Sequence, residues 1–354
     1  MSRCRSVLSA AAILSALLVP PTSAAAAPQQ EDAAPSLAIS GLLFGDIYVV
    51  TSHHLEDAAE SFGGWLRRAY LTADATSGDG WFSRIRLEAN QSGEFERYRF
   101  RVAFKDLHIG FAAGEHRITA GLSPTPTIDL VERYWGLRYL EKTPLDLQRV
   151  ASRDTGIAGR GPLAFDGALR YRAMVGSGIG FGTESGDGYK LMGAISWEFS
   201  PGWIIDAYSS HERRPADTDR FTVQGFLGHS SPGVRFGLLY ANQDRQSDPP
   251  LEVASVFLVW RLSRAASLVG RIDRLLEPSP SGDSTGYLPF DPTARATLFL
   301  GALELELGAS IRLTPGIEVI AYDVSETTGR RPATDAILRL TAFWRSAPSL
   351  WRIH

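Results

Sequence analysis

The segment 168–175 reads Ala-Leu-Arg-Tyr-Arg-Ala-Met-Val, so that its odd-numbered apolar residues alternate with Arg170, Arg172 and Met174. Successive side chains of a β-strand point to opposite faces, so this segment predicts a strand with one apolar and one charged face. The same alternation recurs in 82–90, 188–199 and 335–346. The repeated pattern indicates a sheet whose two faces meet different surroundings.

Segments of this kind run through the chain at short intervals. We predict strands at 37–50, 64–74, 80–90, 97–111, 115–123, 154–161, 167–176, 188–199, 202–211, 219–228, 232–242, 251–262, 265–275, 294–305, 310–322 and 335–346. The number is even, as a closed antiparallel barrel with both chain ends on one side requires. We therefore predict an all-β fold, a transmembrane antiparallel β-barrel of sixteen strands over 37–346. The alternation slips near Asp106, which predicts a β-bulge there.

The connections between these strands alternate in length. Turns such as 77–80 and 200–202 are short, whereas loops such as 53–63 and 277–292 are long. Short periplasmic turns and longer outer loops are typical of outer-membrane barrels. A soluble β-sandwich is the alternative fold, but the loop asymmetry and the tryptophans near strand ends disfavour it, namely Trp65, Trp81, Trp197, Trp203, Trp260 and Trp344.

The first residues resemble an export signal. Arg3 and Arg5 precede an apolar run at 7–19 that is too short to cross a membrane, and small residues follow. We expect a signal peptide at 1–27, cleaved after Ala27 or Ala25, and a bacterial outer-membrane location. A short periplasmic lead at 28–36 and a C-terminal tail at 347–354 would flank the barrel. The only cysteine lies inside the signal, so disulfides are not expected in the exported chain.

The composition excludes two classes of protein. The chain is 44% hydrophobic and 21% charged, with a mean hydropathy of −0.07 and no long apolar run after the signal. A helical membrane protein is therefore excluded, whereas barrel strands need only one apolar residue in two. The formal net charge of −3 shows no basic excess, so nucleic acid is not an expected partner.

The join between the fifth and sixth predicted strands, 124–153, is the longest. A loop of this size usually has a function, and we expect it to fold inward as a constriction of the pore. Arg133 and Arg138 flank the aromatic pair Tyr134-Trp135 and are predicted to face the lumen. The loop has as many acidic as basic residues, so internal ion pairing that holds its shape is the favoured interpretation. The acids Glu132, Glu141 and Asp146 could in addition meet arginines of the inner wall, namely Arg84, Arg86, Arg170 and Arg172. Deletion of 128–148 should raise conductance.

Arginines dominate one part of the predicted inner wall. On the alternation, six of them point inward: Arg84, Arg86, Arg99, Arg101, Arg170 and Arg172. Charged side chains that line a pore set its selectivity. The alternative is that each arginine is a solvated or paired wall residue, which is the more frequent role of a single surface charge. Taken together, we interpret the six as a functional lining.

Signs of catalysis are weak. His53 and His54 precede Glu56 and Asp57, but adjacent strand residues point apart, so no metal site is predicted. The glycine-rich run 176–182 lies between strands without a following helix. We expect no catalytic residues, no metal and no cofactor, and we predict that the protein is not an enzyme.

Several short motifs resemble a known family. The stretches 118–126 and 153–157, and near the end 300–304, 315–319 and 338–344, are similar to segments of the phosphate-selective porin O and P family. The resemblance implies a sixteen-stranded trimeric diffusion pore constricted by its third loop. Phosphate-specific members are lysine-rich in the pore, whereas only three lysines occur here, Lys105, Lys142 and Lys190. Members also end on an aromatic residue, whereas this chain continues past Trp344.

The residues and the resemblance together predict a porin. It would pass small hydrophilic solutes by passive diffusion, with anions as one candidate class. Its expected partners are outer-membrane lipids, two further copies in a homotrimer, and the barrel-assembly machinery. A barrel with a structural, adhesive or enzymatic role and no open pore is the alternative. Lumen width separates the two, because sixteen strands leave an aqueous channel and eight to twelve leave a packed core.

Overall fold

The computed structural model describes residues 35–91, 100–150, 152–178, 188–214, 218–246, 249–284 and 289–352. Helical turns within them are short: η1 (Glu56–Ala58), α2 (Asp129–Trp135), α3 (Pro144–Leu147), η2 (Phe165–Gly167) and η4 (Gly282–Ser284). The strands are β1 (Ser36–Ser52), β2 (Phe62–Thr76), β3 (Trp81–Asn90), β4 (Arg101–Ala113), β5 (His116–Pro124), β6 (Arg153–Ala164), β7 (Leu169–Gly176), β8 (Tyr189–Ser200), β9 (Trp203–Arg213), β10 (Arg220–Ser230), β11 (Val234–Asp244), β12 (Leu251–Arg261), β13 (Ala266–Leu275), β14 (Ala296–Glu306), β15 (Ile311–Tyr322), β16 (Asp335–Arg345) and β17 (Ser349–Arg352).

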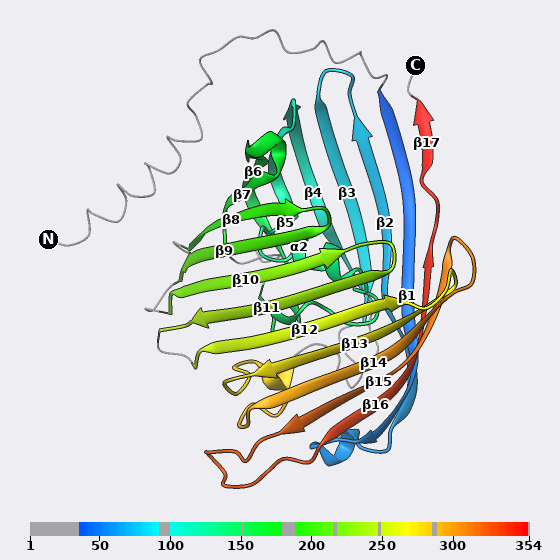
Figure 1. Ribbon diagram of the computed structural model, residues 1–354, viewed down its shortest axis with the longest axis vertical. Coiled ribbons are helices and arrows are strands. Elements are labelled where there is room, and N and C mark those ends of the chain that lie inside the picture. Colours follow the sequence, from blue (N-terminus) through cyan, green and yellow to red (C-terminus); the bar gives the residue numbers. More distant parts are fainter. Residues whose placement is uncertain are drawn as a thin grey trace, which may run out of the picture. The chain divides into compact units, whose positions relative to one another are not determined.

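The strands form one closed sheet (Figure 1). From β1 to β16 each strand pairs antiparallel with the next, and β1 pairs with β2 on one side and with β16 on the other. Residues 36–39 of β1 also pair with β17, which continues the line of β16 after the break at 346–348. The sixteen-stranded antiparallel barrel predicted from the alternation is confirmed, and part of the expected C-terminal tail adds a short strand to its seam.

The strand ends differ from the predicted ones by only a few residues. The β-bulge predicted near Asp106 is present in β4. Arg86 pairs with Asp106 and Leu87 with Phe104, so Lys105 is an extra residue on the β4 side. This bulge brings the side chains of two successive residues, Lys105 and Asp106, to the interior, where both are buried.

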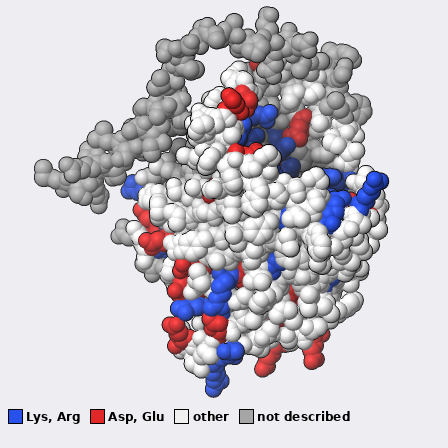
Figure 2. All heavy atoms as spheres, viewed as in Figure 1, with Lys and Arg blue, Asp and Glu red and all other residues white. Residues whose placement is uncertain are grey.

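The outward face of the barrel is apolar. Large hydrophobic side chains alternate along the strands and stand exposed, for example Ile85, Ile157, Ile195 and Trp260. Figure 2 shows a middle zone almost without charged side chains, charges nearer the ends, and a hollow with both signs of charge inside. Among the described residues, no helix is long and apolar enough to cross a membrane.

The two ends of the barrel differ. Turns such as Ser77–Gly80 and Ser231–Gly233 close one end, which we call the inner end, and the longer connections lie at the other, the outer end. Gly202 has a φ of 76° in one of the inner turns, and a side chain there would meet the Ser230 carbonyl at 2.3 Å. Glycine is therefore required at this tight connection.

Candidate constriction site

Loop L3, residues 125–152, joins β5 to β6 and lies inside the barrel (Figure 1). Its helix α2 contacts β10 and β11, and its helix α3 contacts β12. Gly136 ends α2 with a φ of 68°, the left-handed conformation that glycine adopts without strain. The predicted inward fold of the third loop is therefore confirmed.

Apolar contacts fasten L3 to the wall. Trp135 packs edge-on against Phe257 with ring centroids 5.2 Å apart, and Tyr134 packs against Phe226 at 5.7 Å. Other buried apolar residues of the loop extend this core, namely Leu130, Val131, Leu137, Leu145 and Leu147. Burial of each large side chain contributes about 1.5–3 kcal/mol, so these contacts outweigh any exposed ion pair.

Buried polar groups hold the second half of L3. Arg67 donates hydrogen bonds to the carbonyls of Tyr139 (3.3 Å) and Leu140 (2.9 Å), and its charge is paired with Asp46. The Tyr139 hydroxyl donates to Glu304 at 2.5 Å. Because these partners lie on separate strands, they fix the loop at several points of the wall.

The expected ion pairing within the loop is confirmed for two of its acids, whereas the expected contacts of the acids with the four wall arginines are wrong. Glu132 and Asp146 pair with Arg138 of the same loop at 3.4 and 2.7 Å, and Glu141 pairs with Arg339 of β16 at 3.5 Å. In the described part of the chain, none of these acids meets the four wall arginines proposed from the sequence. The helices of L3 pack on β10, β11 and β12, and the polar groups of its second half meet Arg67 of β2 and Arg339 of β16 instead.

Arg138 joins two parts of L3 through these ion pairs. Its side chain is only 16% exposed, between the two acids of its own loop. Burial opposes the charge of Asp146, but Arg138 and the nearby Lys142 hold the pKa of this carboxyl below its ordinary value. A pore-lining role of Arg138 stays a prediction.

The predicted strand arginines on β3 lie inside the barrel with polar partners. Arg84 donates to Asp74 at 2.6 and 3.1 Å. Arg86 donates to Thr72 at 2.9 Å and pairs with Asp106 at 3.2 Å. These side chains remain partly exposed, so they border the open side of the lumen.

The remaining predicted arginines are spread over the wall. Arg172 donates to Asp206 at 2.7 Å, and Arg170 pairs with Glu115 at 3.0 Å near the inner end. Arg101 is exposed at the outer end of β4, opposite Asn90 in the register. Arg99 lies outside the described residues.

A group of arginines gathers where α2 faces β5 and β6. Arg117 and Arg160 stand directly opposite each other in the β5–β6 register. Asp129 of α2 lies 3.4 Å from Arg133 of the same helix and 4.0 Å from Arg160. We call Arg117, Arg133 and Arg160 with Asp129 the guanidinium cluster.

The guanidinium cluster is open to water and has excess positive charge. The side chains of Arg133 and Arg160 are 66% and 53% exposed, and Arg117 is exposed beside the ring of Phe82, 5.5 Å from its centroid. Like charges directly opposite each other on neighbouring strands are destabilising. The cluster thus has three guanidinium groups and one carboxylate, and such an excess of cations favours a positive local potential.

Sequence reasoning identified Arg133 but missed Arg117 and Arg160. Both lie in predicted strands, 115–123 and 154–161. Glycine and small residues surround them, so the alternation that marked Arg84 or Arg172 is weak here. Their register, which the sequence does not give, is what brings them together.

A second polar group lies at the outer end. His53 and His54 stack with ring centroids 4.4 Å apart, against the expectation that they point away from each other, and Asp335 lies beside both. His53 Nδ1 accepts a hydrogen bond from the Leu55 amide at 3.0 Å, so in the neutral ring Nε2 carries the proton. Asp335 also accepts from Tyr322 at 2.5 Å. We call His53, His54, Tyr322 and Asp335 the latch, because hydrogen bonds and ring stacking join them into one group. In this tautomer His53 Nε2 has no lone pair to offer a metal ion.

No family model matches the chain, and no curated protein matches it in sequence. Solved structures do match its fold. An anion-selective porin from Comamonas acidovorans superposes with a TM-score of 0.65 at 10% identity, covering 88% of this chain and 100% of that one. OmpF of Salmonella typhi, in complex with daunomycin, gives 0.62 at 10% identity over 88% and 97%. The outer-membrane channel DcaP of Acinetobacter baumannii gives 0.59 at 9% identity over 90% and 100%. The barrel fold is therefore that of porins.

Proposed function

We propose that the protein is a passive diffusion pore of a bacterial outer membrane that passes small hydrophilic solutes and prefers anions. The observation that carries the proposal is the guanidinium cluster on the open side of L3. A sixteen-stranded barrel is too wide for wall side chains to fill its lumen. L3 occupies the side of β10 to β14, so solutes would pass along the side that carries the arginines.

The outer face and the chain ends support this location. Exposed apolar side chains surround the barrel, as contact with lipid requires. Residues 1–27 have the pattern of an export signal, and the motifs at 118–126 and 338–344 resemble the phosphate-selective porin O and P family. We propose a homotrimer on the same grounds, and one similar structure, OmpT of Vibrio cholerae, is described as a trimer form.

Ion selectivity in a planar bilayer tests the proposal. With a KCl gradient across the membrane, the reversal potential of single channels should show that chloride passes more readily than potassium. The double variant R117A/R160A removes two of the three cations of the cluster and should move the permeability ratio towards one. R330A changes an exposed arginine of an outer loop and is the matched control, with selectivity expected at the parent value.

Two results would contradict the proposal. A folded protein that forms no channel would exclude the pore, and a channel that prefers potassium would exclude the role given to the guanidinium cluster.

A further inference from the structure

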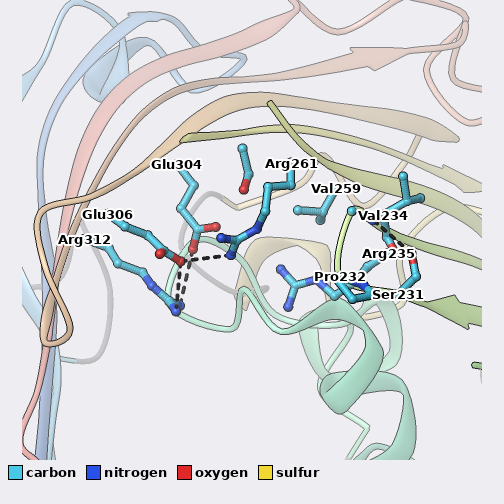
Figure 3. Close-up of a pocket in the computed structure, with 11 residues that line it drawn as sticks. Ser231, Pro232, Val234, Arg235, Val259, Arg261, Glu304, Glu306 and Arg312 are labelled. Carbon is cyan, nitrogen blue, oxygen red and sulfur yellow. Dashed lines mark hydrogen bonds and ion pairs between the residues drawn. The ribbon is translucent and has the colours of Figure 1, made fainter. Parts of the chain in front are cut away.

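A pocket of about 220 Å³ lies inside the barrel at its inner end (Figure 3). The turn Ser231–Gly233 and inward residues of β11 to β15 form its wall. L3 borders it from the lumen side, because Tyr139 of the loop bonds to Glu304 of the pocket. The pocket is thus separate from the guanidinium cluster, which faces the opposite wall.

The acidic groups of the pocket are already neutralised. Arg312 lies 3.3 Å from Glu304 and 3.5 Å from Glu306, and Arg261 lies 3.4 Å from Glu306. Figure 3 shows these four side chains as one ion-paired group on one side of the pocket. Two cations therefore match two carboxylates there.

Arg235 is the additional cation. It lies across the pocket from the ion-paired group (Figure 3), and among the described residues no carboxylate forms an ion pair with it. Its guanidinium rests on Gly136 of L3 so closely that a β-carbon there would be 2.0 Å from Nη1. The pocket consequently has one excess positive charge, in a partly enclosed place where a guanidinium attracts an anion more strongly than in open water.

The other walls suit a small organic molecule. Val259 of β12 and Pro232 of the turn give two apolar side chains near Arg235 in an otherwise mostly polar lining, and Ser267 contributes a hydroxyl. The volume equals that of roughly seven waters at about 30 Å³ each, enough for an acid of a few carbons. A guanidinium presents two parallel N–H donors that match the two oxygens of a carboxylate.

We propose that this inner pocket binds small aliphatic carboxylates, with the carboxylate on Arg235 and the short chain against Val259. The site lies outside the constriction and does not depend on whether the barrel conducts. A purely structural role for Arg235 is the competing explanation, since a cation beside the C-terminal end of α2 also stabilises the helix.

Equilibrium binding of propionate to the folded protein in detergent tests the proposal. Saturation-transfer NMR detects weak binding directly on the ligand and needs no ion current. Propionate should bind saturably, whereas propylammonium, with the same chain and the opposite charge, should not. Inorganic phosphate should bind at least several-fold more weakly, because it cannot use the apolar side.

Variants of the pocket identify the group that binds. R235A should weaken propionate binding about tenfold or more, the effect expected for losing hydrogen bonds to a charged group. S267L fills the pocket and leaves Arg235 in place, so it should weaken binding as well, even if R235A fails to fold. R170A removes a lumen arginine of β7 and should bind like the parent.

Tryptophan fluorescence separates binding from structure when it is compared with that of the same proteins carrying W135F, because the difference between the two is the Trp135 signal and reports on the L3 packing. If R235A shifts the fluorescence but binds propionate at parent strength, Arg235 is structural and the proposal is wrong. Absence of saturable propionate binding to the parent, or full binding by S267L, would overturn it too.

Discussion

At the scale of single residues, the burial of an ion pair determines how much the pair contributes to the stability of this barrel. Arg67 and Asp46 are fully buried as a pair, and Arg67 also holds two carbonyls of L3. Arg84 and Asp74 form a pair of good geometry, but their side chains are 35% and 38% exposed. Removal of one partner from a buried pair leaves an uncompensated charge, whereas water replaces a lost partner at the surface.

R67M should therefore destabilise the protein by about 3–5 kcal/mol, the range for breaking a buried pair. R84M should cost only about 0–1 kcal/mol. The urea dependence of unfolding, followed by tryptophan fluorescence in detergent, measures both variants. Equal losses in the two variants would show that burial does not control these pairs.

The latch at the outer end should respond to pH. Burial lowers the pKa of His53, although Asp335 acts in the opposite direction, and His54 and Tyr322 complete its polar surroundings. The folded latch thus binds protons less readily than the unfolded chain. Its stabilisation is present above the ordinary histidine value of about 6.5 and is lost as the pH falls through the lowered pKa.

Hydrogen exchange of the peptide that contains Leu55 should become faster on acidification, after correction for the intrinsic pH dependence of exchange. Protonated Nδ1 cannot accept the Leu55 amide hydrogen. H53Q keeps an acceptor but does not titrate, so the extra acceleration should be absent in this variant. An identical acceleration in H53Q would assign it to another group.

At the scale of elements, L3 is the one described connection whose removal we expect to leave the strand pairing intact and to change the lumen. The two strands that L3 connects, β5 and β6, are hydrogen-bonded directly to each other. Their pairing therefore does not depend on the loop. The inner faces that L3 covers are apolar, with Phe226, Phe257 and Leu298 among them. Loss of the loop would expose these side chains to water.

Deletion of 128–148 should increase single-channel conductance and reduce selectivity, because it removes both the obstruction and part of the guanidinium cluster. The barrel should still close but unfold at lower urea, since the apolar cover is lost. Bilayer recording and urea titration measure the two effects. Deletion of 326–331 in an outer loop is the control; a parent conductance in the L3 deletion would place the loop outside the solute path.

The sequence predicts strands far better than it predicts the site. Alternation is a local property, so each strand could be located, and the register slip near Asp106 marked the bulge. Which wall L3 covers depends on contacts between Trp135 and Phe257, more than a hundred residues apart, and no local pattern encodes them. The same applies to Arg117 and Arg160, whose proximity comes from pairing of β5 with β6.

At the scale of the molecule, the outer surface of the barrel is wide and apolar, and a hollow of about 540 Å³ lies on it across β14 to β16 and β1. Closed symmetric assembly is the usual way to cover such a surface in part. Light scattering in detergent should give about three times the chain mass, and the oligomer should dissociate on heating. Scattering that reports only the single chain at all concentrations would contradict the trimer.

The seam between β1 and β16 has a consequence for how the chain matures. The amide of Gly41 donates to Ser346 across 305 positions of sequence, so the two ends of the exported chain must meet before the ring is complete. Contacts of such sequence separation form slowly, because a long search precedes the first bond. Closure of the seam is therefore the last step of folding. Until β16 pairs with β1, the outer edges of the first and last strands stay unpaired and can pair with another chain, so a chaperone is needed to prevent aggregation.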